Sequence, residues 1–244
     1  MKRTFLLFFC LLFCLTNITS CSEDCSLHID ENEDGICDTC NTKMQFIYKL
    51  TYDKNGYELD RVGAEYIGGD IVIPSEYNGL PVVEIGYDAF ESEYKLTSII
   101  IPDTVTVIGD DAFENQTSLT SVNVGNGVIT IGTSSFEGCT SLKSVVISDA
   151  TEHIHANAFK DCKSLETVIV GKNVKEIMGC AFEECANLKT IWIPSSIQKM
   201  GAWVFLNTGL TDIYFGVESP EKDWSEKWNE GLDGVNIHWS EIKK

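Results

Sequence analysis

Apolar residues recur along most of the chain with a period of 23 positions. Six phenylalanines define that period: Phe90, Phe113, Phe136, Phe159, Phe182 and Phe205. The position five residues earlier holds an aliphatic residue or methionine in every copy, from Ile85 to Met200, and the position just before each Phe is small in most copies. A register kept over six copies predicts a repeat architecture in which equivalent residues of successive units touch.

Each repeat also carries an L-x-x-L-x-L pattern, which begins six residues after the Phe. The leucines are Leu96, Leu119, Leu142, Leu165 and Leu188, with Leu210 one place early. The last two apolar positions, such as Val145 and Ile147, have the period of two that is typical of a β-strand with one buried face. A unit of 23 residues cannot bury such a face alone, so stacked units must pair their strands in a parallel sheet. Each unit is expected to run strand, turn, short strand and short helical turn.

Two segments carry a resemblance to a known family. Residues 101–113, IPDTVTVIGDDAF, and residues 136–145, FEGCTSLKSV, are similar to the BspA-like leucine-rich repeat, a type found on bacterial cell surfaces. The resemblance covers about residues 71–216 and implies a mostly β leucine-rich-repeat solenoid. His155 and Met178 replace the usual Gly, where we expect a local adjustment and no change of fold.

The repeats need caps at both ends, because an open solenoid exposes its core and unpaired strand edges. Residues 44–70 are expected to form the first cap, with a hairpin between Phe46 and Leu59 around a type I′ turn at Asn55-Gly56. Residues 217–244 are expected to form the second. Trp224 and Trp228 indicate a short amphipathic helix there, and residues 235–239 a closing strand.

The N-terminus is typical of an exported protein. Lys2 and Arg3 precede an apolar run from Thr4 to Leu15, which is too short to remain in a membrane as a span. Residues 18–21, ITSC, resemble the bacterial lipobox, which implies removal of residues 1–20 and a lipid anchor on Cys21. An ordinary secretory peptide with a cysteine near its cleavage site is the alternative.

The charge of the predicted mature chain argues against a nucleic-acid partner. Residues 1–20 contain two cations and no acid, so 18 − 2 = 16 basic residues and 37 acidic residues remain, a net charge of 16 − 37 = −21. A protein of this sign is repelled by phosphates. An acidic surface that keeps an exported protein soluble is the simplest interpretation.

Residues 21–43 form a short module with metal-ligand spacing. Cys25, His28, Cys37 and Cys40 offer the number and kind of ligands of a tetrahedral zinc site. Asp30, Asn32, Asp34 and Asp38 follow the spacing of a calcium loop, although position 12 is Asn41 instead of Glu. A zinc site, a calcium site and a disulfide without metal are all compatible with this spacing. In each case the module is a short cross-linked spacer before the repeats.

The other cysteines follow the repeat. Cys139, Cys162 and Cys185 each lie three residues after a Phe, which predicts a column of buried thiols that act as small apolar side chains in preference to disulfides. Cys180 falls in a column of mostly polar residues and is expected to be an exposed free thiol.

The main strands also predict a binding surface. Strand alternation directs one column of side chains, four residues after each Leu, away from the core. Its members are Ile100, Asn123, Val146, Ile169, Trp192 and Tyr214. An exposed apolar stripe is typical of an interaction site, although β-branched neighbours also stabilise a sheet by cross-strand packing. Ser98, Ser121, Ser144, Thr167 and Thr190 are expected beside it.

No catalytic motif accompanies this surface: the chain contains no nucleophile elbow, phosphate-binding glycine loop or zincin helix. We therefore expect a monomeric, non-enzymatic module on the cell surface that binds an extracellular or host protein or glycoprotein. Some members of the family it resembles are adhesins. A structural spacer and a glycan-acting enzyme are the alternatives.

Overall fold

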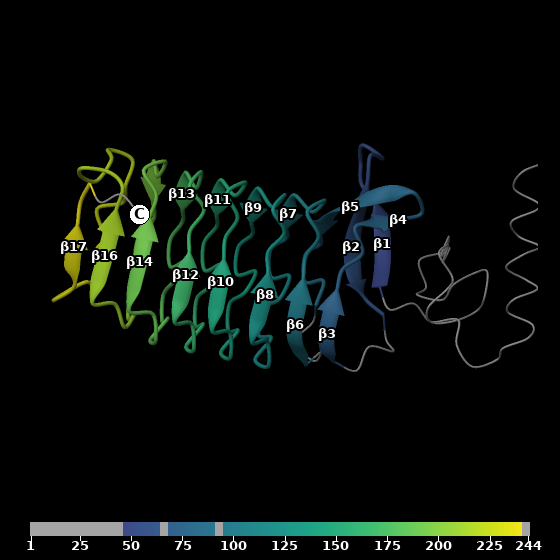
Figure 1. Cartoon of the computed structure of the whole chain (residues 1–244), viewed down its shortest axis with the longest axis horizontal. Helices are drawn as coiled ribbons and strands as arrows, with labels where there is room; N and C mark the ends of the chain where they lie inside the picture. Colours follow the sequence, from purple (N-terminus) through teal and green to yellow (C-terminus); the bar gives the residue numbers. More distant parts are fainter. Residues whose placement is uncertain (1–45, 64–67, 91–94, 241–244) are drawn as a thin grey trace, which may run out of the picture.

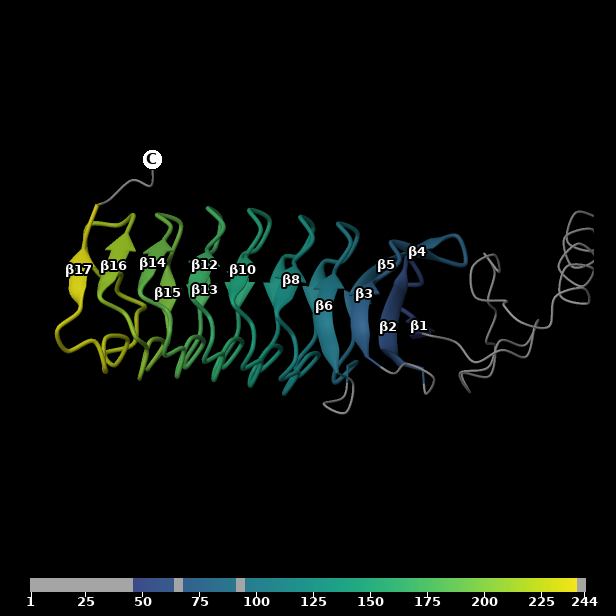
Figure 2. The same ribbon diagram turned by 60° about the horizontal axis from the view of Figure 1, so that its bottom comes forward.

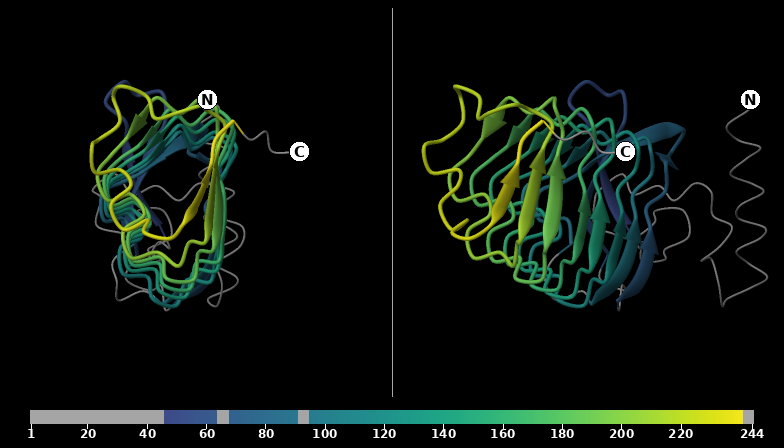
Figure 3. Two further views of the ribbon diagram at one scale, coloured as in Figure 1. Left: turned by 90° about the vertical axis from the view of Figure 1, so that its left-hand side faces the viewer. Right: turned by 60° about the vertical axis from the view of Figure 1, so that its left-hand side comes forward.

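The computed structural model describes residues 46–63, 68–90 and 95–240, which hold 17 β-strands and no helix. These strands wind into an elongated solenoid with rows of parallel strands on two sides (Figure 1). Seen from its end, successive coils lie over one another and enclose the core (Figure 3). The predicted signal peptide, lipid anchor and metal module fall in residues 1–43, outside the described residues.

The first row of strands, here called the main wall, contains the L-x-x-L-x-L segments. It is built from β3 (Gly69–Val72), β6 (Leu96–Ile100), β8 (Ser121–Asn123), β10 (Ser144–Val146) and β12 (Thr167–Ile169), followed by β14 (Thr190–Ile193), β16 (Asp212–Phe215) and β17 (Asn236–His238). The row consists of two parallel sheets, β3 to β12 and β14 to β17, and residues 23 positions apart pair from β6 to β12, as Val122 and Val145 do. Figure 2 shows the row side by side along the solenoid.

The second row, here called the opposite wall, contains the short strands before each Phe. It consists of β5 (Leu80–Ile85), β7 (Val107–Ile108), β9 (Thr130–Ile131), β11 (His153–Ile154), β13 (Glu176–Ile177) and β15 (Lys199–Met200). At its N-terminal end β5 pairs with β2 (Tyr57–Val62), which pairs in turn with β1 (Phe46–Leu50), and the short β4 (Glu76–Tyr77) also pairs with β5.

A ladder of stacked phenylalanine rings runs through the core. The six rings of the 23-residue period are fully buried, and neighbouring ring centroids lie between 4.7 Å (Phe90 to Phe113) and 6.0 Å (Phe182 to Phe205) apart. The rings of Phe136 and Phe159 are parallel, with an interplanar angle of 0°. The prediction that equivalent residues of successive coils touch is therefore confirmed.

The segment after each short strand is a pair of tight turns, and the predicted helical turn is wrong. Glu114 N–H donates to Asp111 O at 3.0 Å and Gln116 N–H to Phe113 O at 3.3 Å, but no helix continues from them. Left-handed residues prevent it, two in every coil where both positions are described, because an α-helix needs negative φ throughout. One column is Asp88, Asp111, Ser134, Asn157, Cys180 and Trp203, and the other is Asn115, Gly138, Asp161, Glu184 and Asn207, with φ between 51° and 72°.

The buried cysteine column has a structural role beyond filling space. Each thiol donates a hydrogen bond to the carbonyl of the Phe in the preceding coil: Cys139 to Phe113 at 3.3 Å, Cys162 to Phe136 at 3.2 Å and Cys185 to Phe159 at 3.2 Å. Gln116 makes the equivalent bond to Phe90 O at 3.0 Å. All three cysteines are free and buried, as predicted, and burial raises the pKa of Cys139 and Cys185 to about 12.

His155 and Met178 leave the hydrogen-bonded ladder of the opposite wall unbroken. Their N–H groups donate to Ile131 O and Ile154 O at 2.9 Å, as Gly132 does to Ile108 O at 2.9 Å. At Gly132 itself a Cβ would lie 2.6 Å from the backbone of Gly109. The coils that carry His155 and Met178 must therefore leave more room at this point, which is a local adjustment within an unchanged fold.

The N-terminal hairpin forms, but its turn differs from the prediction. β1 and β2 pair antiparallel from Phe46↔Val62 to Leu50↔Tyr57, so residues 51–56 make the loop. The positive φ falls on Lys54 instead of Asn55-Gly56, which rules out the two-residue type I′ turn. The Asp53 carboxylate accepts hydrogen bonds from Thr51 Oγ1 at 2.8 Å and from Asn55 N at 3.2 Å, and so stabilises the longer loop.

The C-terminal segment closes with turns and a strand, so the predicted amphipathic helix is wrong. Its backbone groups form separate turns, such as the one closed by Trp224 N–H and Glu221 O at 3.0 Å, and others bond to the last coils: Ser225 N–H donates to Met200 O at 2.8 Å, and Lys227 O accepts from Trp203 N–H at 3.0 Å. The predicted closing strand is β17. The rings of Trp224, Trp228 and Trp239 lie 5.4, 5.6 and 4.6 Å from that of Phe215 and pack against this end of the core.

Ser135 is a test of the packing between coils. Its buried hydroxyl has no hydrogen-bond partner, whereas most coils have Ala in the same column. An unsatisfied buried polar group costs about 1–3 kcal/mol, so Ser135→Ala is expected to raise the free energy of unfolding in urea by ~1 kcal/mol. The reverse change in the next coil, Ala158→Ser, is the matched control and should lower it; a destabilised Ser135→Ala would contradict this view of the column.

Cys180 tests the left-handed column. It is half-buried instead of exposed as predicted, burial raises its pKa to about 11, and its φ is 60°. Asn tolerates this conformation better than most residues, so Cys180→Asn should stabilise the fold by about 0.5–1 kcal/mol. Cys180→Ser, which lacks that preference, should give a smaller gain; equal midpoints for the two variants in chemical denaturation would refute the explanation.

Candidate functional site

The outer surface of the main wall carries a column of side chains that runs over both of its sheets, here called the docking stripe. It consists of Val72, Ile100, Asn123, Val146, Ile169, Trp192, Tyr214 and His238. Strand pairing places Ile100, Asn123, Val146 and Ile169 next to one another, and Trp192 beside Tyr214. The six residues expected to share a face therefore do so, and their role in binding stays a prediction.

Large apolar side chains are exposed along the N-terminal part of the docking stripe. The exposed fractions are 63% for Val72, 45% for Ile100, 54% for Val146 and 40% for Ile169. Asn123 is also exposed and interrupts the series with an amide. Four exposed aliphatic residues aligned on one face form an apolar patch, which is a typical feature of an interaction surface.

Val72 and His238 belong to the stripe but were not predicted. Residues 71–74, IVIP, are similar to residues 99–102, IIIP, yet they lie 28 positions earlier and so fall outside the 23-residue register. His238 lies in the predicted closing strand, 24 positions after Tyr214. A search for the strand pattern that tolerated insertions would have found both residues.

Three stacked rings form the C-terminal part of the stripe. The centroids of Trp192 and Tyr214 lie 4.2 Å apart and those of Tyr214 and His238 4.3 Å apart, with interplanar angles of 6° and 9°. Each ring covers a face of its neighbour, so all three side chains are half-buried. The stack holds the rings in fixed positions, because moving one of them would uncover its neighbour.

A column of small polar side chains runs beside the docking stripe, with a carboxylate near each end. Its members are Asp70, Ser98, Ser121, Ser144, Thr167, Thr190, Asp212 and Asn236. Asp70 Oδ1 accepts hydrogen bonds from Ser98 Oγ at 2.6 Å and Thr97 Oγ1 at 2.7 Å, and both bonds lower its pKa. The predicted Ser and Thr residues thus lie where expected.

Asp212 is held in the same way at the C-terminal end. His238 Nε2 lies 3.0 Å and Asn236 Nδ2 3.1 Å from Oδ1, and Thr211 Oγ1 donates to Oδ2 at 2.9 Å. These hydrogen bonds, with that from His238 first, lower the pKa of Asp212. The carboxylate is therefore ionised and fixed in orientation beside the aromatic stack.

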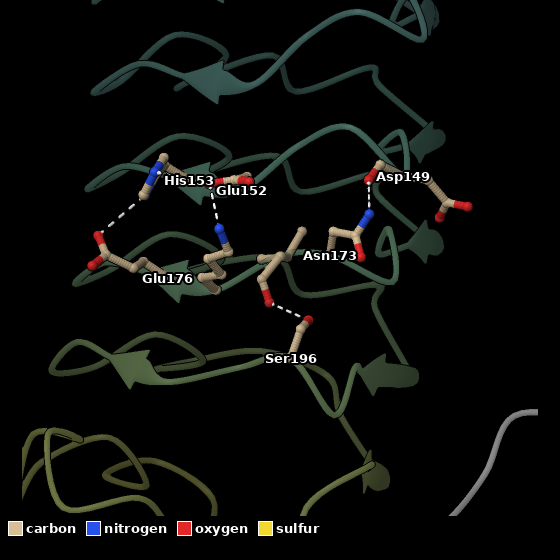
Figure 4. Close-up of polar contacts among 8 residues, drawn as sticks. Asp149, Glu152, His153, Asn173, Glu176 and Ser196 are labelled. Carbon is tan, nitrogen blue, oxygen red and sulfur yellow. Dashed lines mark hydrogen bonds and ion pairs between the residues drawn. The ribbon is translucent and has the colours of Figure 1, made fainter.

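The opposite wall has a different surface, because its charges pair with one another. Figure 4 shows ion pairs between successive coils: His153 Nδ1 lies 3.3 Å from Glu176 Oε2, and Lys175 Nζ lies 2.6 Å from Glu152 Oε2. At the adjoining loop edge Asn173 Nδ2 donates to Asp149 O at 2.8 Å, and Ser196 Oγ donates to a backbone carbonyl at 2.6 Å. Because these charged side chains already pair with side chains of neighbouring coils, they are less available to bind a partner protein.

The turns between the opposite wall and the main wall carry a cluster of carboxylates. Asp88, Asp110, Asp111, Glu114 and Glu137 lie close enough to interact. Burial, and then repulsion by the neighbouring acids, raises the pKa of Asp111 and of Glu114. In the described part of the chain no group of three His, Cys, Asp or Glu residues is placed to hold a metal ion. The proposed zinc and calcium ligands in residues 25–41 lie outside it.

None of the described residues belongs to a helix that could cross a membrane. Parallel strands stacked every 23 residues, with an apolar core and a regular outer face, define the class of the protein as a leucine-rich-repeat solenoid. A sequence model of the BspA type leucine-rich repeat region matches residues 83–217 in six copies. The chain belongs to this family.

Solved structures with the same architecture come from several bacteria. A leucine-rich repeat protein of T. pallidum (TpLRR) is 26% identical, with a TM-score of 0.63 over 81% of this chain and 97% of its own. A leucine-rich cell surface protein of Faecalibacterium prausnitzii A2-165 is 28% identical, with a TM-score of 0.55 over 73% of this chain and 55% of its own. The pneumococcal vaccine antigen PcpA, 20% identical over 70% of this chain and 48% of its own, shares the fold with a TM-score of 0.57. No curated protein is significantly similar in sequence.

The acidic turns give a pH-dependent prediction. Because the pKa of Asp111 is raised in the folded state, its ionisation opposes folding. This penalty is absent below the unfolded pKa of about 3.9 and complete above the raised folded pKa. Asp111→Asn, which suits the left-handed backbone, should therefore raise the thermal midpoint at pH 7 more than at pH 3. Asp161→Asn is the control, since Asp161 is left-handed but its carboxylate pairs with Lys163 Nζ at 3.2 Å; an equal gain for Asp111→Asn at both pH values would argue against a raised pKa of Asp111 in the folded state.

Proposed function

We propose that this chain is a protein-binding module of the bacterial cell surface, and that it binds its partner through the docking stripe. One observation carries the proposal: the outer face of the main wall presents aligned aliphatic and aromatic side chains, while the opposite wall presents ion pairs. Both walls have the same core and the same repeat, so packing inside the solenoid does not explain the difference between their outer faces.

The chemistry of the docking stripe suits a protein surface. Removal of exposed valine and isoleucine side chains from water by a bound partner lowers the free energy of the complex. Trp and Tyr are the residues most enriched at the energetic centre of interfaces, and the stack of Trp192, Tyr214 and His238 keeps two of them in place. The adjoining Ser and Thr hydroxyls supply donors and acceptors for a partner's backbone.

The location is proposed from the N-terminus and the relatives. The N-terminal pattern of residues 1–21 resembles a lipoprotein signal with Cys21 as the anchor, and the F. prausnitzii relative is described as a cell surface protein. Such an anchor would leave the solenoid outside the cell. Adhesion to a host or extracellular protein or glycoprotein is the specific role that we infer for this placement, and catalysis is not part of it.

The proposal is tested by binding to immobilised extracellular-matrix and mucus proteins. Trp192→Ala combined with Tyr214→Ala should weaken binding to a captured protein by ~2 kcal/mol or more, and Val146→Ser should weaken it by a smaller amount. Ile129→Ser is the matched control, because Ile129 is an aliphatic residue beside β9 on the opposite wall with a similar exposure, 42% against 54% for Val146.

Equal losses for Val146→Ser and Ile129→Ser would show that the stripe has no special part in binding. Unchanged affinity of the Trp192 and Tyr214 double variant would point instead to a structural spacer that uses another surface. Thermal unfolding of each variant shows whether the fold survives, so that a loss of affinity is assigned to the surface alone.

A further inference from the structure

The carboxylates of the main wall and those of the opposite wall interact with different groups, and this difference indicates which kind of partner the main wall suits. On the opposite wall Glu152 pairs with Lys175, and at the loop edge Asp149 pairs with Lys172, both at 2.6 Å. On the main wall Asp70 and Asp212 are held by hydroxyl, amide and imidazole groups. Among the described residues neither of these two carboxylates forms an ion pair with a lysine or arginine.

Hydrogen bonds hold both carboxylates in fixed orientations, and Asp212 also pairs with the His238 imidazole at 3.0 Å. Donors from Ser98 and Thr97 keep Asp70 ionised and fixed, and His238, Thr211 and Asn236 do the same for Asp212. Asp70 is exposed, and the Asp212 side chain keeps an exposed fraction of 26%. Two oriented negative charges therefore face solvent near the two ends of the docking stripe.

The charged residues between these ends balance one another. The residues just before the polar column include Lys143, Glu166 and Lys189, all exposed. Lys143 and Glu166 lie at the middle of the main wall and their charges cancel, whereas Lys189 lies next to Asp212, whose N–H donates to Lys189 O at 3.4 Å. Among these residues the centre of the face therefore carries no net charge, whereas Asp70 and Asp212 lie near its two ends.

The separation of the two aspartates sets the size of a matching ligand. Asp70 lies on β3 and Asp212 on β16, and the strands between them along the wall are β6, β8, β10, β12 and β14. Six strand-to-strand steps of about 4.8 Å give roughly 29 Å. An extended peptide advances about 3.3 Å per residue, so roughly nine residues cover this distance.

We propose that the docking stripe takes an extended polypeptide segment that is basic at both ends and apolar between them, lying along the solenoid axis across the strands. Basic side chains at its ends meet Asp70 and Asp212, and its apolar centre covers Ile100, Val146 and Ile169. A polypeptide acidic at its ends is repelled at both. This assignment rests on the proposed function, since it names the partner chemistry of the same surface.

The test uses synthetic peptides and the intact chain. The probe is a fluorescent peptide of about nine residues, with lysine at both ends and alternating valine and threonine between them. One comparison peptide has glutamate in place of the lysines, and another has serine in place of the valines. Fluorescence anisotropy is expected to show binding of the lysine peptide and at least fivefold weaker binding of both comparison peptides. The preference over the glutamate peptide should disappear at about 1 M salt, where the Debye length falls to about 3 Å.

Charge variants of the protein locate the effect. Asp70→Asn combined with Asp212→Asn should weaken binding of the lysine peptide roughly fivefold, the combined effect expected for two exposed charge pairs. The matched control is Glu152→Gln combined with Glu176→Gln, which removes two carboxylates from the opposite wall and should change binding less than twofold. Equal losses in the two double variants would show only a general charge effect and would overturn the proposal.

The outcomes separate this inference from the proposed function. If the Trp192 and Tyr214 double variant loses a captured protein partner while the glutamate peptide binds the wild-type chain as well as the lysine peptide, the stripe binds protein but the basic-ended ligand is wrong. Failure of the lysine peptide to bind at all overturns the inference as well. If the lysine peptide does not bind and the Trp192 and Tyr214 double variant also captures protein partners as well as the wild-type chain does, both proposals are wrong.

Discussion

The structure depends on in-register stacking of coils of equal length. Each coil places its Phe on the Phe of the coil before it, at a centroid separation of about 5 Å in most pairs, while parallel backbone hydrogen bonds join the coils along the opposite wall and within each of the two sheets of the main wall. The strand spacing of about 4.8 Å and the ring separation agree, so hydrogen bonding and core packing favour the same geometry. A coil that lost the register would lose both interactions at once.

Stacking also explains residues that look unusual in isolation. A thiol at Cys139, Cys162 or Cys185 bonds to a Phe carbonyl one coil away, a role that Gln116 fills in its own coil. Trp203 occupies a left-handed position where earlier coils have Asp, Ser, Asn or Cys, and its ring centroid lies 4.8 Å from Lys227 Nζ while its Nε1 contacts Glu230. Trp203 thereby ties the C-terminal segment to the last coils.

The same regularity creates the candidate site. Because every coil contributes one outward residue at each strand position, any chemical preference at that position becomes a continuous column. On the main wall the preference is aliphatic and aromatic, with hydroxyls beside it. On the opposite wall it includes acids and bases that pair between coils. The candidate site is therefore spread over a surface, and each coil contributes only a part of it.

The sequence by itself determined the repeat length, the parallel strands, the buried Phe and Cys columns and the six central members of the docking stripe, from Ile100 to Tyr214. All of these follow from side-chain periodicity, which local residue order records directly. Only the tertiary structure decided the turn conformations, the loop of the N-terminal hairpin and the absence of a helix around Trp224, because their backbone groups bond to residues of other coils or to nearby side chains. It also decided that Val72 and His238 join the stripe, since strand pairing in space tolerates insertions that break a fixed period in the sequence.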